Sequence, residues 1–266
     1  MNANQHELDN QGRTNVDKKT IAAAFAGASI LTFAGMADAA DVKVMASAAL
    51  REAYLELVPQ FERSTEHKVA TTWAGTVEIM KRMQAGETFD LVIMAGPSID
   101  ELIKLGKIVP GSRVDLAKSG VGAAVRAGAP KPDISSGEAL KRAMLAAKSI
   151  AYSTGPSGVY LAGLFQRMGI AEEIKSKVKI APPGMPVGEM VARGEAEIGF
   201  QQVSELLPVA GTDFIGPLSA DVQQITVFAG GIHAGAKEPD AAKALVKFIT
   251  SPAAVPVIKK KGMEPG

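Results

Sequence analysis

The sequence predicts an α/β protein of two lobes, each with a mixed, mainly parallel sheet flanked by helices. Short β-branched segments alternate with segments of helical periodicity, as in parallel α/β sheets. In Asp90–Met94 four apolar residues follow one another, which is typical of a strand covered on both faces. Two glycine-rich segments, Lys118–Arg126 and Gln224–Gly235, are long enough to cross between lobes. We expect residues 41–120 and 223–266 to form lobe I and residues 121–222 to form lobe II.

Residues 1–40 have the order of a signal peptide for export. Lys18-Lys19, an apolar run at Ile21–Phe33 and the small-residue sequence Ala37-Asp38-Ala39 follow one another. The apolar run is shorter than the roughly 18–20 residues of a membrane-spanning helix. A buried N-terminal helix is the alternative. We expect cleavage near Ala39 or Ala40 and a periplasmic protein.

Composition excludes several classes of function. The chain has 29 basic residues (Lys and Arg) and 28 acidic residues (Asp and Glu). Residues 1–40 hold three of the basic and four of the acidic residues. The rest of the chain therefore has 26 basic and 24 acidic residues, a net charge of +2. A nucleic-acid partner requires a basic stripe, and the sequence shows none. Cysteine is absent, which excludes disulfides and thiolate metal sites. We expect no metal, no cofactor, and a monomer whose size suffices for a core.

The strands are expected where β-branched and apolar residues cluster between turn signals. They are Val42–Met45, Val69–Trp73, Asp90–Met94, Val121–Arg126, Ser149–Tyr152, Val178–Ala181 and Glu197–Gln201. The helices are expected where apolar residues recur every three or four positions. They begin near Leu50, Thr76 and Ile99, and further ones cover Gly137–Ala147, Gly158–Met168, Val187–Arg193 and Asp240–Ile249, with a restart after Ser251-Pro252.

The junction between the first strand and the first helix has the features of an anion site. Ser47 is a natural N-cap, and Ala48 is small, so the amides of the helix start are accessible. The helix macrodipole adds partial positive charge there, and Arg51 adds a full one. The alternatives are an ordinary capped helix and a surface arginine paired with Glu52 or Glu56.

A second polar segment precedes the helix at Gly158. Three hydroxyl residues, Ser153, Thr154 and Ser157, alternate with glycine and proline, so main-chain amides here can cradle an oxyanion. The segment is not a Walker A loop, because no Gly-Lys-Ser/Thr follows. His67 and His233 lie in unrelated contexts, and no catalytic motif singles out an acid or base.

Four segments of the chain together resemble the molybdate-binding-protein-like family. They are the opening strand–serine–helix, the sequence GETFDLVIMAG, the crossover GVGAAVRAGAPKPDI and the closing AKEPDAAKALVKFITSPAA. These are periplasmic type II solute-binding proteins of ABC transporters. The resemblance covers nearly all of the chain after residue 40. It implies two α/β lobes, two hinge crossovers, an anionic ligand held between the lobes, and a membrane permease as partner.

The resemblance also implies particular ligand-binding residues. Ala46–Ala48, with Ser47 and Ala48, matches the first oxyanion loop of the family, and Ala74-Gly75-Thr76 matches the second. The pair Ser157-Gly158 matches the third loop, close to Ser153, and Met185-Pro186-Val187 matches the fourth. The molybdate binders have a tyrosine after the strand that corresponds to Glu197–Gln201.

This chain departs from the family at that tyrosine. It has Gln201 and Gln202 there, which can donate and accept hydrogen bonds, and Arg51 suits bidentate pairing with a carboxylate. We therefore favour a small organic di- or tricarboxylate over molybdate. Surface positions for both glutamines are the alternative.

A second hypothesis follows from the same resemblance. Aconitate isomerase, a periplasmic enzyme, resembles this family, and its reaction moves a proton across an allylic system of a tricarboxylate. Arg51, Thr76, Ser153 and Ser157 would hold the carboxylates. The first expectation is a binding protein, and an isomerase is the alternative.

Overall fold

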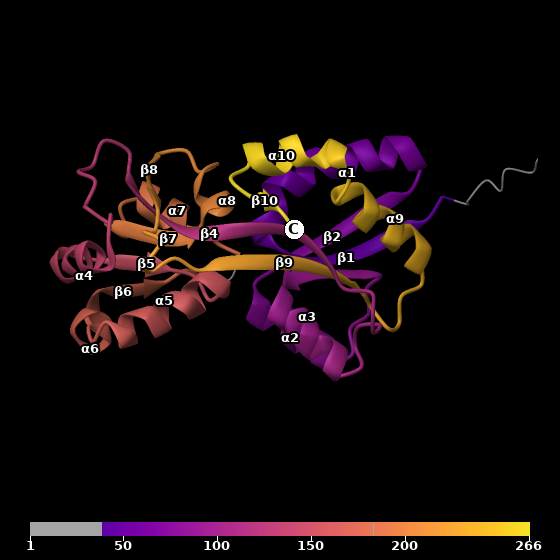
Figure 1. Cartoon of the computed structure of the whole chain (residues 1–266), viewed down its shortest axis with the longest axis horizontal. Coiled ribbons are helices and arrows are strands. Elements are labelled where there is room, and N and C mark those ends of the chain that lie inside the picture. The colour runs from indigo at the N-terminus through magenta and orange to yellow at the C-terminus, as the bar shows by residue number, and fades with distance from the viewer. Residues whose placement is uncertain (1–38, 183) are drawn as a thin grey trace, which may run out of the picture. The chain divides into compact units, whose positions relative to one another are not determined.

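One long mixed sheet organises residues 39–182 and 184–266, which a computed structural model describes (Figure 1). Its strand order is β2-β1-β3-β9-β4-β7-β5-β6, and β8 and β10 both pair with β4. Helices cover both faces, which confirms the predicted α/β fold. The predicted signal peptide, residues 1–40, lies outside the described residues apart from its last two.

The elements follow the predicted alternation. The strands are β1 (Asp41–Ser47), β2 (Lys68–Ala74), β3 (Leu91–Ala95), β4 (Val114–Arg126), β5 (Ile150–Tyr152), β6 (Val178–Ile180), β7 (Ile198–Gln202), β8 (Thr212–Pro217), β9 (Ile225–Ile232) and β10 (Glu264–Pro265). The α-helices are α1 (Arg51–Thr65), α2 (Thr76–Gln84), α3 (Gly96–Lys104), α4 (Gly137–Ala146), α5 (Pro156–Arg167), α6 (Ala171–Ile174), α7 (Val187–Ala192), α8 (Val203–Leu206), α9 (Pro239–Ile249) and α10 (Val255–Lys260). Short 3₁₀ turns are η1 (Ala48–Leu50), η2 (Lys175–Lys177) and η3 (Pro252–Ala254).

The first part of the sheet is built on β1, which pairs in parallel with β2 and β3. Side chains alternate across a strand, so Val42, Val44 and Ala46 pack with α1, α9 and α10 while Met45 packs with α2 and α3. All five residues of β3 are buried. The continuous apolar run in the sequence thus reflects a strand covered on both faces.

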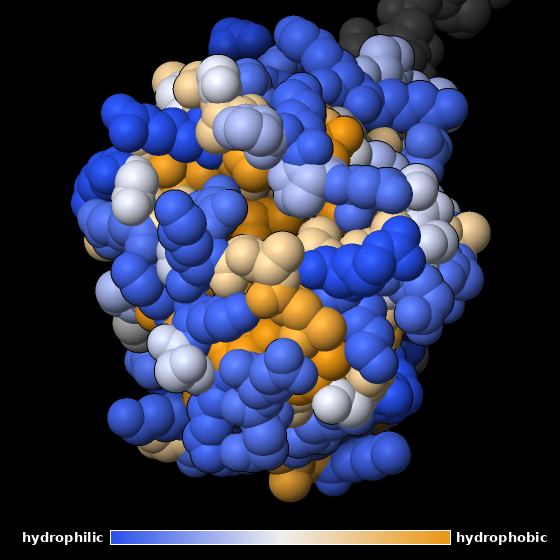
Figure 2. Space-filling view, turned by 90° about the vertical axis from the view of Figure 1, so that its left-hand side faces the viewer, coloured by the Kyte–Doolittle hydropathy of each residue, from blue (hydrophilic) through white to orange (hydrophobic). Residues whose placement is uncertain are grey.

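The second part of the sheet is built on β5, which pairs in parallel with β6 and β7. Its larger core includes Phe165 and Phe200, and α7 closes a smaller core on the opposite face. Figure 2 shows the end of the molecule where α4 and α6 lie; most of the surface there is hydrophilic, with hydrophobic side chains gathered in separate areas.

Strand β4 connects the two parts of the sheet. Its residues 114–120 pair with β9, and its residues 121–126 pair with β7 and β8. Gln223 lies where β4 changes its partner strands. Its side chain accepts a hydrogen bond from the Val121 amide (2.8 Å) and donates one to the Val121 carbonyl (3.0 Å). The sequence predicts the second crossing at Gln224–Gly235. Strand β9, which lies within this segment, pairs with β3 and with residues 114–120 of β4. The division into two lobes stays a prediction.

Several elements differ from the sequence prediction, among them β4 and β8. Strand β4 begins at Val114, seven residues before the predicted start, because its polar first half pairs with β9. Strand β8 is absent from the prediction, since glycine and proline in its sequence signal a loop. Among the described residues no single helix is long and apolar enough to cross a membrane; α9 and residues 252–260 pass together only as a pair bent by 55°.

Candidate ligand-binding site

The predicted oxyanion loops are four junctions at which a strand ends and a helix begins, and we call them the junction loops. Loops one and two follow β1 and β2. These strands pair in parallel, with Ser47 opposite Ala74 at their last residues. The carboxyl ends of parallel strands meet at one edge of a sheet, where ligands bind in such folds. The first two loops therefore lie side by side.

Loops three and four belong to the second part of the sheet. Tyr152 at the end of β5 is opposite Ile180 of β6 and Phe200 of β7. The residues that follow these positions, including Ser153 and Gln201, therefore share one edge. The third loop leads into α5 and the fourth into α7.

Ser47 caps the first junction, as the sequence predicts. Its side chain is buried, and its Oγ accepts a hydrogen bond from the Ala49 amide at 3.5 Å. The capped element is the 3₁₀ turn η1, which comes before α1. Ala48 is half-buried at the first position of this turn.

Two hydroxyl groups in the junction loops are buried without a hydrogen-bond partner among the described residues. They are Oγ1 of Thr76, the first residue of α2, and Oγ of Ser157, in the first turn of α5. Buried polar atoms are normally satisfied. Each of these hydroxyls lies beside free amides of a helix start, so both helix starts offer donors to an anion.

The third loop is folded tightly against the start of α5. Ser153 Oγ accepts from the Gly155 amide at 3.2 Å. A Cβ atom at Gly158 would lie 1.6 Å from the Ser153 carbonyl oxygen, so only glycine fits there. The glycine thus allows the helix start to approach the loop, which places the hydroxyls of Ser153 and Ser157 in the same turn region.

The structure brings Val187 and Gln201 together. Gln201 is buried; its Oε1 accepts from the Val187 amide at 2.9 Å, and its Nε2 donates to Glu205 at 2.7 Å. The Val187 amide, which the resemblance assigns to the ligand, is thus held by Gln201 in this structure. Gln201 acts as the link between β7, α7 and α8.

Gln202 lies in β7 and not in a loop after it. It is fully buried, and its amide faces the crossing strands. In one of its two orientations the side-chain amide forms hydrogen bonds through both its nitrogen and its oxygen. The nitrogen then donates to the carbonyls of Ser119 (3.0 Å) and Gly120 (3.1 Å), and the oxygen accepts from the Thr226 hydroxyl (3.1 Å). Gln202 therefore ties β7 to β4 and β9.

Sequence reasoning missed Ser204 and Glu205, on the short helix α8. Ser204 Oγ donates to the Ala49 carbonyl at 2.8 Å, which joins α8 to the first junction loop. Burial raises the pKa of the Glu205 carboxyl to about 7, although hydrogen bonds from Gln201 and from the Gln202 backbone oppose the shift. The one feature of the sequence that could have indicated the bond between Gln201 and Glu205 is their spacing of four residues.

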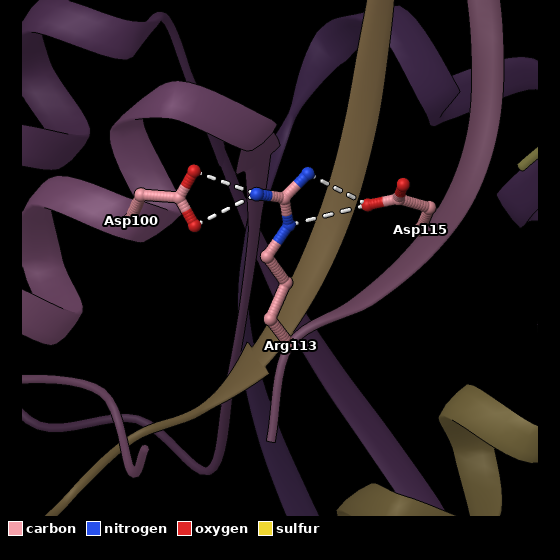
Figure 3. Close-up of polar contacts among 3 residues, drawn as sticks. All are labelled: Asp100, Arg113 and Asp115. Carbon is pink, nitrogen blue, oxygen red and sulfur yellow. Dashed lines mark hydrogen bonds and ion pairs between the residues drawn. The ribbon is translucent and has the colours of Figure 1, made fainter. Parts of the chain in front are cut away.

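Arg51 is exposed at the first position of α1. It forms no ion pair with another described residue. The alternative partner Glu56 is bound instead by Lys260 and Lys261. Arg113 provides a contrast to Arg51. Its guanidinium nitrogens form ion pairs with a carboxylate oxygen of Asp100 at 2.6 Å and of Asp115 at 2.9 Å (Figure 3). No residue in the described part of the chain therefore neutralises the guanidinium of Arg51.

Two surface cavities lie away from the junction loops. One of about 250 Å³ borders the starts of β1 and β3, and one of about 470 Å³ lies between α4 and α5. Neither is lined by a predicted site residue. Within residues 39–182 and 184–266, no cluster of three or more His, Asp or Glu residues could hold a metal ion.

Comparison with known proteins identifies the family. Residues 42–264 match the family described as bacterial extracellular solute-binding protein. The chain is 38% identical to an aconitate isomerase of Pseudomonas sp over 228 residues, covering 84% of this chain and 87% of the relative. It is 32% identical to the molybdate-binding protein ModA of Azotobacter vinelandii over 246 residues, covering 89% and 94%.

The fold agrees with this relationship. The solved structure of the Azotobacter vinelandii periplasmic molybdate-binding protein superposes with a TM-score of 0.71 at 20% identity, covering 85% of this chain and 99% of that one. With a family match over most of its length, the chain belongs to the bacterial extracellular solute-binding protein family.

Proposed function

We propose that the junction loops bind a small di- or tricarboxylate and that the chain isomerises it in a reaction of the aconitate isomerase type. The observation that carries this proposal is the donor set. It combines the hydroxyls of Thr76 and Ser157, which find no hydrogen-bond partner in the described part of the chain, with the exposed guanidinium of Arg51, which forms no ion pair there. Hydroxyls and helix amides bind any oxyanion, whereas a guanidinium fork matches the planar carboxylate.

The region of the missing tyrosine also favours a carboxylate over molybdate. The resemblance to the molybdate-binding-protein-like family implies a tyrosine after the strand that corresponds to β7. Here that region holds Gln201, bonded to Val187 and Glu205, and Gln202, bonded to the crossing strands. A tetrahedral dianion would lack one neutral donor, while a larger acid can use Arg51 instead. The 38% identity to an aconitate isomerase points the same way.

The first experiment is a ligand panel with an activity assay. Thermal unfolding is followed with molybdate, tungstate, sulfate, citrate and both aconitate isomers. A ligand at 100 times its Kd should add about 2.7 kcal/mol to the free energy of unfolding. We expect this with aconitate, together with an absorbance change as one isomer converts to the other. Stabilisation by molybdate alone, without conversion, would reject the proposal.

Replacing Arg51 with alanine should weaken aconitate binding about 30- to 1000-fold, or about 2–4 kcal/mol, because a bound carboxylate loses the full positive charge of the guanidinium. Ser157→Ala removes a neutral hydroxyl and should cost only about 1 kcal/mol. Titration calorimetry measures both. Arg63→Ala, an exposed arginine in the last turn of the same helix, is the matched control. Equal affinities for the parent and Arg51→Ala would show that Arg51 does not contact the ligand.

A second function, delivery of the carboxylate to an ABC transporter permease from the periplasm, is favoured by the family description and the molybdate-binding relatives. It predicts export and removal of residues up to about Ala40. Mass spectrometry of the exported protein tests this, and a mature chain that keeps Lys18-Lys19 would contradict it.

A further inference from the structure

We infer that Glu205 is the catalytic residue that takes a proton from a methylene carbon of the bound di- or tricarboxylate and delivers a proton to the former vinylic carbon. This inference rests on the proposed function. An allylic isomerisation needs a group that removes a proton from a methylene carbon and delivers one to the former vinylic carbon while the double bond shifts between them. Electrons and protons balance, and no other reactant is required.

The position of Glu205 is set by three elements that meet at the junction loops. Its carboxylate accepts from Gln201, whose other end holds the amide at the start of α7. The neighbouring Ser204 is bonded to Ala49, directly after the first loop. Glu205 therefore lies on a short helix held between the first and fourth loops. Its half-buried side chain is enclosed by protein yet not sealed from the surface.

No opposite charge fixes the protonation of Glu205. The elements packed against α8 are β4, β7, η1, α1 and α7. The charged residues of these elements are Arg51, Glu52, Glu56, Glu62 and Arg63 on α1, Asp115, Lys118 and Arg126 on β4, and Glu189 on α7. None of them forms an ion pair with Glu205 among the described residues. Glu189 is paired with Arg193 instead. Burial is the main cause of the raised pKa, so the carboxyl exchanges its proton near neutral pH, as a general base must.

The other acidic groups fit this role less well. Asp90 is held by three backbone amides at the opposite end of β3, and Asp221 accepts from the Gly137 amide beside α4. His233 is buried, but its backbone pairs with Asp90, so it lies at the same distant end. Among the described residues, Glu205 combines a carboxyl whose pKa is raised to about 7 with a bond from Gln201, whose other end holds the Val187 amide of the fourth junction loop.

The test compares Glu205→Gln with Glu205→Asp and with the control Glu189→Gln in the full chain. Glutamine keeps the size and one acceptor oxygen, so folding and aconitate affinity should persist, with thermal stability at pH 8 equal to or above that of the parent. We expect kcat for aconitate isomerisation to fall about 100-fold or more in Glu205→Gln, with recovery of part of the rate in Glu205→Asp. The parent kcat/KM should fall below about pH 7 as the base is protonated.

Deuterium exchange separates this inference from the proposed function. Proton NMR in D₂O follows the methylene and vinyl signals of aconitate. Exchange by the parent that is lost in Glu205→Gln supports the inference even if no net isomerisation occurs, in which case only the isomerase assignment fails. Full isomerisation by Glu205→Gln would overturn the inference and leave the function standing. Absence of both isomerisation and exchange in the parent would overturn both.

Discussion

Replacing Gly158 with alanine should destabilise the protein by roughly 3 kcal/mol or more, since overpacking against rigid atoms reaches the upper end of the usual cost. The added Cβ would lie 1.6 Å from the Ser153 carbonyl oxygen, which is backbone and cannot rotate away. Either the third junction loop moves or the first turn of α5 unwinds. Both movements displace Ser153 and Ser157, so ligand affinity should fall together with stability.

Thermal or urea unfolding measures the loss, and calorimetry with aconitate measures the affinity. Gly163→Ala is the matched control on the same helix, because its Cβ would meet only the flexible end of Arg167 at 3.3 Å. A glycine-to-alanine change inside a helix normally stabilises by about 0.5–1 kcal/mol. If Gly158→Ala and Gly163→Ala behaved alike, the close approach at Ser153 would not govern this loop.

The elements of the fold that could be predicted from the sequence are those that depend on the residues of one short segment. The apolar run of β3 indicates burial on both faces, and all of its residues are buried. The strand–serine–helix start at Ser47 likewise predicts a capped turn, and the hydroxyl does accept from Ala49. Strand β8 was not accessible, because its residues form a strand only by pairing with the second half of β4.

The candidate site could be predicted only in part, for the same reason. The sequence places Ser157 and Gly158 at a helix start, but the contact of Gly158 with Ser153 requires the folded loop. Gln201 and Gln202 are adjacent in the sequence, yet strand alternation sends one to α7 and the other to the crossing strands. Glu205 acquires its properties from elements distant in sequence, which no local pattern reveals.

The second large effect is expected at Asp90. Its buried carboxylate accepts from the amides of Lys43 (2.7 Å), Lys237 (2.7 Å) and Glu238 (2.9 Å). The last two amides precede α9, whose N-cap residue Glu238 makes no side-chain cap bond, so Asp90 caps this helix from another part of the chain. One side chain thus connects β1, β3 and α9.

Asp90→Ala should therefore lower the free energy of unfolding by about 3–4 kcal/mol, because it leaves three amides without an acceptor. Asp90→Asn keeps one acceptor oxygen but turns an NH₂ group toward a donor, so we expect an intermediate loss. Urea unfolding at constant pH measures both variants. The control is Asp240→Ala. The exposed Asp240 carboxylate pairs with Lys243 at 2.9 Å, so this variant should stay near the parent value.

The Asp90 variants also distinguish stability from ligand binding. Asp90 precedes β3, whereas the junction loops follow the opposite ends of β1 and β2. Folded Asp90→Ala protein should therefore bind aconitate with the parent's affinity, in contrast to Gly158→Ala, which should lose both properties. A loss of less than about 1 kcal/mol in Asp90→Ala would mean that the amides find other acceptors. A loss of affinity without a loss of stability would mean that this end of the sheet is coupled to the loops.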